Sequence, residues 1–436
     1  MLTNPALLSV IVMIGLSLLK LNVLLALIIA ALVGGLAANM SLTETMTILL
    51  GGMGNNAETA LNYVLLGALA AGIQKSGAAK VLTQKLSKSI DGTGKVLVFI
   101  IALISTFSQN AIPVHIAFIP ILIPPLIGIF NRLKLDRRAV ATALTFGLKA
   151  PYVSIPIGYG LIFHNLIRDE MASNGLQIGV NDIWQVMWIP GLAMVVGLLI
   201  AVFITYRQPR EYSTLDNVQS LEKQADETDV YFNKTHFVAI LGALSALVVQ
   251  LTLGSLILGA ILGLFIMLIG GAIKWSSMDE MINSGIGMMG FIAFVMLVAS
   301  GYADVIRATG GVETLVDSVI AIIGGNQFIA AVGMIFLGLL ITMGIGTSFG
   351  TIPVITAIYV PLAMQLGFSQ LAIVLIIGCA AALGDAGSPA SDSTLGPTAG
   401  LNVDGQHDHI WDTCVPTFMH FNIPIMIFGV IGAMIL

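Results

Sequence analysis

The chain has 436 residues, of which 57% are hydrophobic and 9% are charged, whereas about a quarter of an ordinary soluble protein is charged. Its mean hydropathy of +0.97 and its repeated apolar runs predict an all-α polytopic membrane protein and exclude an ordinary soluble one. The net charge of −5 gives no basic surface for nucleic acid, and the two cysteines, Cys379 and Cys414, form no spaced motif, which argues against a disulfide scaffold.

The apolar runs predict ten crossings of the membrane. In chain order they lie near residues 5–19, 22–39, 57–74, 139–168, 183–206, 236–252, 255–273, 287–306, 370–399 and 413–434. The first run lacks a basic n-region, so we expect it to remain as a helix and not to be removed as a signal peptide. Three more polar segments, 41–54, 77–90 and 311–323, are expected to form short surface helices.

Two apolar segments, 96–129 and 328–366, do not fit whole crossings. Each has a polar tip that runs into Ile-Pro-Val, STFSQNAIPV in the first and TMGIGTSFGTIPV in the second. Two full crossings need about 20 residues each plus a turn, so we predict re-entrant helical hairpins instead. The tips offer hydroxyls and amides for binding, with simple turn chemistry as the alternative. The candidate tip residues are Ser108, Gln109, Asn110, Gly346, Thr347 and Ser348, with His115 just beyond the first tip.

Two of the crossings contain helix breakers. They are GLKAPYVSIPIG (147–158) and GDAGSPASDSTLGPTAG (384–400). Polar unwound backbone at membrane depth is tolerated only where protein or a water-filled cavity surrounds it, so the second break should line a site. Its carboxylates, hydroxyls and freed carbonyls are the ligand chemistry of hard cations such as Na⁺. The side chains concerned are those of Asp385, Ser388, Ser391, Asp392, Ser393 and Thr394. Asp385 and Asp392 are the predicted Na⁺ carboxylates, and a helix-capping role is the alternative for Asp392.

Lys149 is the other charge that the pattern puts inside the membrane. It is expected at the first break, within about a turn of the position that matches Asp385 in the second half. The two groups would pair in the absence of the ion, Na⁺ would displace the ammonium, and the lysine would carry the exchanged proton. The alternative is a lysine that snorkels to the basic membrane surface. The HDH sequence at 407–409 is expected to be solvated and not a metal site.

Recurring motifs predict an internal duplication. Ile-Pro-Val occurs at 112–114 and again at 352–354. We expect an N-terminal repeat over 1–206 and an inverted C-terminal repeat over 236–436, each with five transmembrane helices, one of them broken, plus a re-entrant hairpin. An odd number of crossings turns the second copy over. The long polar linker 207–235 and the basic loops should face the cytoplasm, which suits a multi-pass protein of a bacterial inner membrane.

The run GDAGSPASDSTLGPTAG, followed by HDHIWDTCVP, resembles the signature of NhaC-type Na⁺/H⁺ antiporters, within the wider ion transporter superfamily. The resemblance implies two inverted repeats, an elevator type of motion, a homodimer, and an ion or substrate site at Asp385, Ser388, Ser391, Asp392, Ser393 and Thr394. It implies no cofactor, with Na⁺ and H⁺ as the coupled or transported ions. One branch of this family is described as carrying amino acids such as histidine.

These observations predict a secondary active transporter, with Na⁺/H⁺ antiport by alternating access as the leading function. The closest alternative is Na⁺- or H⁺-coupled transport of an amino acid or small carboxylate. A channel is the alternative from another class, but hairpins from opposite sides indicate an occluded middle. The sequence has no metalloprotease helix motif and no nucleophile with its base, so we expect no enzyme. Expected partners are membrane lipid, a small cation and a second copy of the chain.

Overall fold

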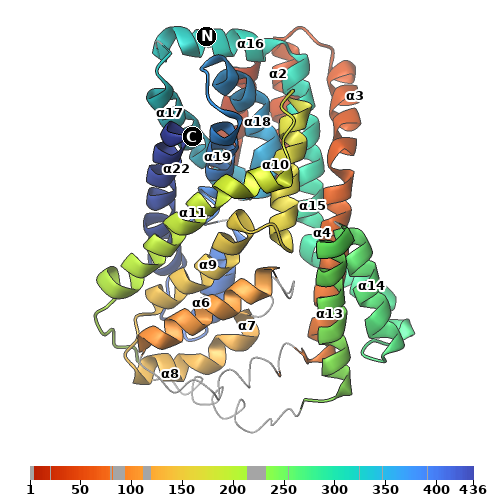
Figure 1. Cartoon of the computed structure of the whole chain (residues 1–436), viewed down its shortest axis with the longest axis vertical. Helices are drawn as coiled ribbons and strands as arrows, with labels where there is room; N and C mark the ends of the chain where they lie inside the picture. Colours follow the sequence, from red (N-terminus) through yellow and green to blue (C-terminus); the bar gives the residue numbers. More distant parts are fainter. Residues whose placement is uncertain are drawn as a thin grey trace.

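The computed structural model describes residues 4–19, 21–78, 81, 94–110, 119–213, 232–253, 255–323, 325–345, 347–389 and 391–436. Every regular element in these ranges is a helix (Figure 1), which confirms the all-α prediction.

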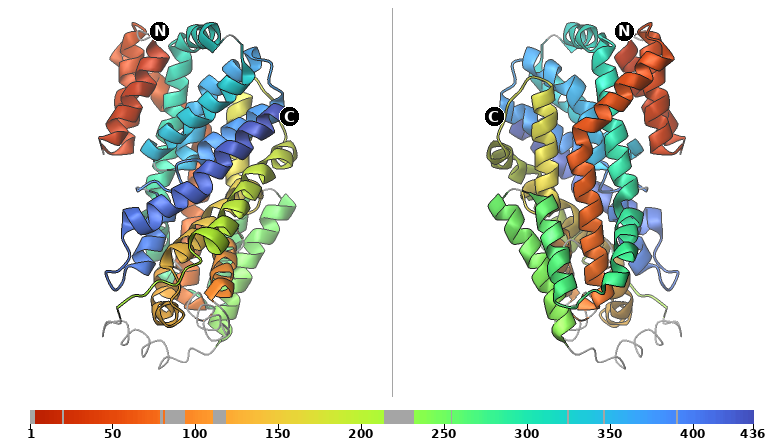
Figure 2. Two further views of the ribbon diagram at one scale, coloured as in Figure 1. Left: turned by 90° about the vertical axis from the view of Figure 1, so that its left-hand side faces the viewer. Right: turned by 90° about the vertical axis from the view of Figure 1, so that its right-hand side faces the viewer.

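The first group of helices packs around α4 and α15. Its members are α1 (Pro5–Leu18), α2 (Val23–Ala37), α3 (Leu42–Met53), α4 (Ala57–Ser76), α13 (Lys234–Leu253), α14 (Leu256–Ile269) and α15 (Met278–Ala308). α3 and α4 both pack along α15, α13 and α14 lie against α4, and Figure 2 shows α1 and α2 together at one edge. α4 and α15 approach closely through Gly67 and Gly285: a Cβ on Gly285 would lie 2.4 Å from the backbone nitrogen of Ala68. Small residues bring helix backbones together in this way inside membranes.

The second group holds the interrupted helices. Its members are α6 (Gly94–Asn110), α9 (Arg137–Ser154), α10 (Tyr159–Ser173), α11 (Val180–Ile200), α17 (Gln327–Ile345), α18 (Ser348–Gln365), α19 (Gln370–Ala382), α20 (Asp392–Leu401) and α22 (Ile423–Ile435). α6 packs on α9, α19 packs on α11, α17 and α22, and α18 joins the two groups by contacting both α10 and α15.

Short elements connect these helices. They are η1 (Gly54–Asn56), α7 (Ile119–Leu122), η3 (Pro124–Leu126), α8 (Ile127–Arg132), η5 (Trp275–Ser277), α16 (Gly311–Ile323), α21 (Val415–Thr417) and the π-helical turns η4 (Ala201–Thr205), η6 (His409–Cys414) and η7 (Phe418–Asn422). α3 and α16 coincide with two of the three short helices expected from the sequence, and the third, 77–90, lies almost wholly outside the described residues.

The first predicted break is present between α9 and α10, which meet at an angle of 46°. Ile155 is extended, with φ −126° and ψ 121°, because a residue before proline is pushed out of the helical region and Pro156 follows it. Gly158 then starts α10 at φ +60°. The prediction that Lys149 lies at this break is wrong: it lies inside α9, more than a turn before the helix ends.

The second predicted break separates α19 from α20 and contains two glycines with positive φ, Gly384 at +78° and Gly387 at +110°. Segment 328–366 forms two successive helices, α17 and α18, as predicted, and its re-entrant path in the membrane stays a prediction. The Gln327 side-chain amide, at the start of α17, donates to the carbonyl of Leu366, which follows α18, at 2.8 Å, so the two helices are antiparallel. α6 is the first arm of the other predicted hairpin, and residues 111–118 of that hairpin lie outside the described ones.

Membrane-spanning length is met by four helices within the described residues, and by the bent pair α9–α10 as a possible fifth span. Most of the other expected crossings coincide with shorter apolar helices of 10–17 residues, such as α2 and α14, and the crossing expected at 57–74 coincides with α4, a helix of 20 residues. The apolar helices therefore agree with a multi-pass membrane protein. The number of ten crossings, the inversion of the repeats and the domain boundaries stay predictions.

Candidate functional site

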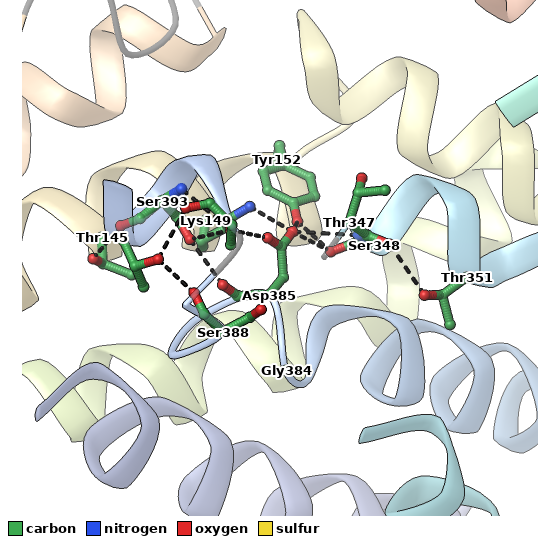
Figure 3. A network of polar contacts seen from close by, with 12 residues as sticks. Thr145, Lys149, Tyr152, Thr347, Ser348, Thr351, Gly384, Asp385, Ser388 and Ser393 are labelled. Atoms are coloured by element: carbon green, nitrogen blue, oxygen red, sulfur yellow. Dashed lines mark hydrogen bonds and ion pairs between the residues drawn. The ribbon is translucent and has the colours of Figure 1, made fainter. Parts of the chain in front are cut away.

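Asp385, in the break between α19 and α20, is the centre of the site. It is 2% exposed, and its Oδ2 atom lies 2.5 Å from the Nζ atom of Lys149, whose side chain is 10% exposed. Figure 3 shows Lys149, Tyr152 and Ser348 converging on this carboxylate from different elements. An ionised group inside a membrane is costly unless it is paired, so the lysine and the aspartate each offset the burial of the other. The pairing expected from the sequence is thus present.

Hydroxyl groups complete the shell of the carboxylate. Tyr152 Oη donates to Asp385 Oδ2 at 3.0 Å, Ser348 Oγ donates to the same oxygen at 2.6 Å, and Ser391 Oγ donates to Oδ1. Ser348 is the first residue of α18, and its backbone N–H also points at Oδ2, at 3.4 Å. The positive end of the α18 dipole therefore faces the negative charge.

Aromatic rings close this shell on the α9 side. The Tyr152 ring stacks on Phe349 with centroids 5.4 Å apart, and Phe163 meets Tyr152 edge-on at 5.3 Å. Lys149 Nζ lies 5.2 Å from the centre of the Tyr152 ring, which adds a cation–π contact to its ion pair. These contacts fix the tyrosine hydroxyl on the carboxylate.

The remaining hydroxyls of the break hold its own backbone. Ser393 Oγ donates to the Asp385 carbonyl at 2.9 Å, and Thr394 Oγ1 donates to the Ser388 carbonyl at 2.5 Å. From α9, Thr145 Oγ1 donates to the Ser393 carbonyl at 2.8 Å, so the first interrupted helix also supports the second (Figure 3). Ser388 is buried and lies 3.4 Å from the Met343 carbonyl.

Asp392 is not equivalent to Asp385. It is the first residue of α20 and is half-buried. The capping role considered for it from the sequence belongs to its neighbour: Ser391 is the N-cap, and its Oγ accepts from the Ser393 backbone N–H at 3.2 Å. A carboxylate in the first turn is still favoured by the helix dipole.

The predicted tip residues that the structure describes lie against the breaks. Thr347 is the N-cap residue of α18, next to Ser348 on Asp385, and its carbonyl accepts from Thr351 Oγ1 at 3.0 Å. At the other break, a Cβ on Gly158 would lie 2.4 Å from the carbonyl oxygen of Asn110, the last residue of α6, which is itself buried. Among the predicted tip residues, Gly346 and His115 lie outside the described residues, as do the side chains of Ser108 and Gln109.

Gln250 of α13 binds the first break from the other group of helices. Its Oε1 accepts from the Gly158 backbone N–H at 3.1 Å, and its Nε2 donates to the Gly158 carbonyl at 3.3 Å. Gln250 is 3% exposed, so both ends of a buried side-chain amide are used on one glycine. This contact joins α13 to the α9–α10 break.

A buried ion pair lies at the linker end of α9. The Arg137 guanidinium binds Asp404 through two parallel contacts of 2.7 and 2.6 Å, and both side chains are fully buried. Burial by itself raises the pKa of Asp404, but the hydrogen bonds and charge of Arg137 prevail and hold that pKa below its usual range. Tyr212, from the start of the linker, stacks on the guanidinium at 4.1 Å.

The expectation that the HDH sequence is solvated is wrong for His407, whereas Asp408 is exposed. His407 is 2% exposed, its Nε2 lies 2.7 Å from Thr413 Oγ1, and burial lowers its pKa to about 4. His409 reaches the break itself: its Nε2 donates to the Pro389 carbonyl at 3.0 Å. Within the described residues, no group of three His, Cys, Asp or Glu side chains is arranged to hold a metal ion.

Three participants were missed from the sequence: Tyr152, Thr145 and Gln250. The helical spacing could have predicted Tyr152, because it follows Lys149 by three residues and so lies on the same face of the helix. Thr145, four residues before Lys149, shares that face too. No such spacing predicts Gln250, because its partner is 92 residues away and glutamine has no fixed role in an apolar helix.

Comparison with known proteins gives two family matches. The model described as "Na+/H+ antiporter family" matches residues 143–432, and one described as "Na+-H+ antiporter family" matches residues 4–90. An uncharacterized membrane protein of Vibrio parahaemolyticus is 49% identical, over 99% of this chain and all of its own length. YuiF of Bacillus subtilis, which carries the provisional name of an amino acid transporter, is 49% identical over 99% of this chain and all of its own length.

Two solved structures share the fold. The YdaH transporter of Alcanivorax borkumensis has a TM-score of 0.61 and 15% identity, and the alignment covers 89% of this chain and 88% of that one. MtrF of Neisseria gonorrhoeae, described as illuminating a class of antimetabolite efflux pumps, has a TM-score of 0.58 and 14% identity, with 91% and 85% covered. The family matches and the structural neighbours are transporters and not enzymes, as expected from the sequence.

Proposed function

The chain belongs to the Na⁺/H⁺ antiporter family, and from this premise we propose that it exchanges Na⁺ for H⁺ across the membrane at the Lys149–Asp385 pair. The observation that carries the proposal is the buried contact of 2.5 Å between Lys149 Nζ and Asp385 Oδ2, in the middle of an interrupted helix. A cation that binds Asp385 must displace the ammonium, because both compete for the same oxygen.

The exchange then balances in charge and protons. Na⁺ enters, takes the Asp385 carboxylate, and the displaced Lys149 ammonium loses one proton to water. When Na⁺ leaves on the other side, the lysine amine takes up one proton and pairs with Asp385 again. Loss of the carboxylate partner favours the neutral amine in a buried place, which is the physical link between the two steps.

Oxygen atoms around the pair would supply the other Na⁺ ligands. Na⁺ prefers hard oxygen donors, and the break offers hydroxyls and carbonyls in place of a cluster of acids. In this proposal Ser348 and Ser391 turn their oxygens from Asp385 to the ion. The remaining predicted ligands of the break are Ser388, Asp392, Ser393 and Thr394, with Thr347 beside Ser348 at the start of α18.

Amino acid transport is the second candidate, and one observation favours it. The site presents one cation, Lys149, and one anion, Asp385, which is the complement of a zwitterion. The ammonium of an amino acid would take the place of Lys149 on Asp385, and its carboxylate would bind Lys149 and the N-terminus of α18 at Ser348. The name of YuiF points in the same direction.

One experiment separates the two candidates. The purified protein is placed in liposomes with an internal pH dye, and a Na⁺ gradient is imposed, with Asp385→Asn and with Lys75→Gln as matched variants. Lys75 belongs to an exposed pair with Glu280, so its loss should leave transport intact. Antiport predicts proton movement driven by Na⁺ alone in the wild type and Lys75→Gln, and none in Asp385→Asn. If the dye responds only after an amino acid such as histidine is added, the antiport proposal is refuted in favour of the second candidate.

We further propose that the protein works by alternating access, as a homodimer of inverted repeats with re-entrant hairpins, in a bacterial inner membrane with the linker in the cytoplasm. The basic loops support this orientation. Both native cysteines are buried, so added cysteines can report topology. Ser213→Cys, in the segment that follows η4, should react with an impermeant maleimide only from the cytoplasm. Gln177→Cys, in the loop between α10 and α11, should react only from outside. The reverse pattern overturns the orientation.

A further inference from the structure

A pocket at the linker end of α6, α9 and α11 has no part in the exchange site. Its volume is about 360 Å³. The lining comes from the first turn of α6, the loop before α9, the first turn of α9, and the end of η4 with the start of the linker. The side chains that matter are Lys95, Lys134, Asp136, Tyr206 and Arg207.

The charge of this pocket is positive. Lys134 pairs at 2.6 Å with Glu211, but both side chains are mostly exposed, so the pair is weak and open to exchange. Lys95 and Arg207 form no ion pair with any residue in the described part of the chain. The acid in the lining, Asp136, already binds the Arg138 guanidinium at 2.6 Å. Two cations are therefore left to bind an anion.

Apolar groups surround the charges. Val98, Leu133 and Val202 line the same pocket, and Lys95 Nζ lies 5.2 Å from the ring centre of Phe203, which is 46% exposed. Tyr206 also lines a second cavity, an apolar groove of about 430 Å³ between the end of α11 and the start of α22.

The groove between α11 and α22 is open to the surface of the protein. Its lining includes Ile200, Ile423 and Ile427, and Ile427 is 51% exposed. In a membrane protein, such exposed aliphatic side chains on α11 and α22 meet lipid chains. A basic pocket and an apolar groove that share Tyr206 make one amphipathic surface at the edge of the membrane.

We propose that this surface binds an anionic phospholipid. Its phosphate lies between Lys95, Lys134 and Arg207, and one acyl chain follows the groove past Tyr206. Basic pockets between transmembrane helices on the cytoplasmic side favour anionic head groups, and basic side chains near the surface add to that attraction. A free phosphate would use the cations but not the groove, so the groove favours the lipid. The proposal does not depend on which solute the protein carries.

The test uses the full chain in detergent and native mass spectrometry, with phosphatidylglycerol and phosphatidylcholine as the probes. The pocket variant is Lys95→Gln/Arg207→Gln, which leaves Lys134–Glu211 intact. The control is Lys234→Gln/Lys274→Gln, which removes the same charge from two exposed lysines away from the pocket. We expect phosphatidylglycerol to bind the pocket variant roughly 30-fold more weakly than the wild type and the control. Phosphatidylcholine should bind all three alike.

Two further arms complete the design. Lys95→Arg/Arg207→Lys keeps both charges and should keep the lipid, which separates loss of charge from damage to the fold. Glycerol 1-phosphate carries the phosphate without acyl chains and should fail to displace the lipid at equal concentration. The proposal is overturned if the pocket variant binds phosphatidylglycerol like the wild type, if the control loses it equally, or if glycerol 1-phosphate displaces it.

Discussion

Replacement of Lys149 by methionine tests the central ion pair most directly. The change keeps an unbranched chain of similar length but removes the charge that lies 2.5 Å from Asp385. The carboxylate then keeps only the hydrogen bonds from Tyr152, Ser348 and Ser391. Removing one partner of a buried pair costs about 3–5 kcal/mol, because the other charge is left uncompensated.

The size of the effect can be read as a melting temperature. With an unfolding entropy of about 2 cal/mol/K per residue, 1 kcal/mol corresponds to roughly 1 °C in a chain of 436 residues, so Lys149→Met should melt about 3–5 °C below the wild type. Adding Asp385→Asn removes the stranded charge and keeps an oxygen acceptor, so the double variant should regain most of the loss. Lys75→Met, in the exposed pair with Glu280, should cost no more than about 1 kcal/mol.

Sodium makes the assay specific. Without the competing ammonium, Na⁺ in hundredfold excess over its Kd should return about 2.7 kcal/mol to Lys149→Met. It should return nothing to the double variant, and choline at the same ionic strength should return nothing to either. The measurement is the unfolding of the purified protein in detergent, followed by intrinsic fluorescence with and without NaCl. Equal melting of Lys149→Met and the wild type, or equal protection of the double variant by Na⁺, would refute the reasoning.

Three further changes have defined outcomes. Gln250→Leu leaves the Gly158 N–H and carbonyl unpaired and should lower the unfolding free energy by about 1–3 kcal/mol for each group in the same thermal assay. Gln250→Glu keeps an acceptor for the N–H but sets a carboxylate against the carbonyl, so its loss should shrink as the pH is lowered and the protonated carboxyl can donate to that carbonyl. Gly384→Ala puts a Cβ 2.8 Å from the Met343 nitrogen at φ +78° and should abolish transport in liposomes, while Gly405→Ala, at φ +74° with open space around it, should only lower stability. Asp404→Asn should be less stable than the wild type above about pH 4. The pKa of Asp404 is lower in the folded protein than its unfolded value of about 3.9, so the ionised carboxylate stabilises the wild type above that pH, and this stability disappears as the pH falls through the folded pKa. A difference in stability between wild type and variant that stays constant below pH 4 would contradict this.

Local signals in the sequence were enough for the interruptions. Pro156 ends α9 because of what it does to the residue before it, and the polar run at 384–400 cannot continue an apolar helix. The Lys149–Asp385 pair was within reach for a related reason: few charges occur in the apolar segments, so two of them near the matching breaks were natural partners.

Contacts between distant helices were beyond that reasoning. Arg137 and Asp404 are separated by 267 positions, and no local pattern says that the end of α20 returns to the start of α9. The prediction that His407 is solvated was wrong because a residue of a short loop usually faces water, whereas His407 packs against Thr413 of η6. The side-chain period of a helix shows which residues share a face, but not which helix that face meets.

In the proposed exchange, the Lys149–Asp385 pair also determines how the membrane potential acts on the carrier. When the pair is closed, ammonium and carboxylate sum to zero charge. When Na⁺ occupies Asp385 and the lysine has lost its proton, the sum is again zero. Moving one elementary charge across 100 mV is worth about 2.3 kcal/mol, and neither form carries one. The proposed exchange through this pair is electroneutral, so its end point would depend on the two ion gradients and not on voltage. A carrier without the lysine would bear a charge of −1 when empty, and a potential that is negative inside would hold that empty site at the outer face.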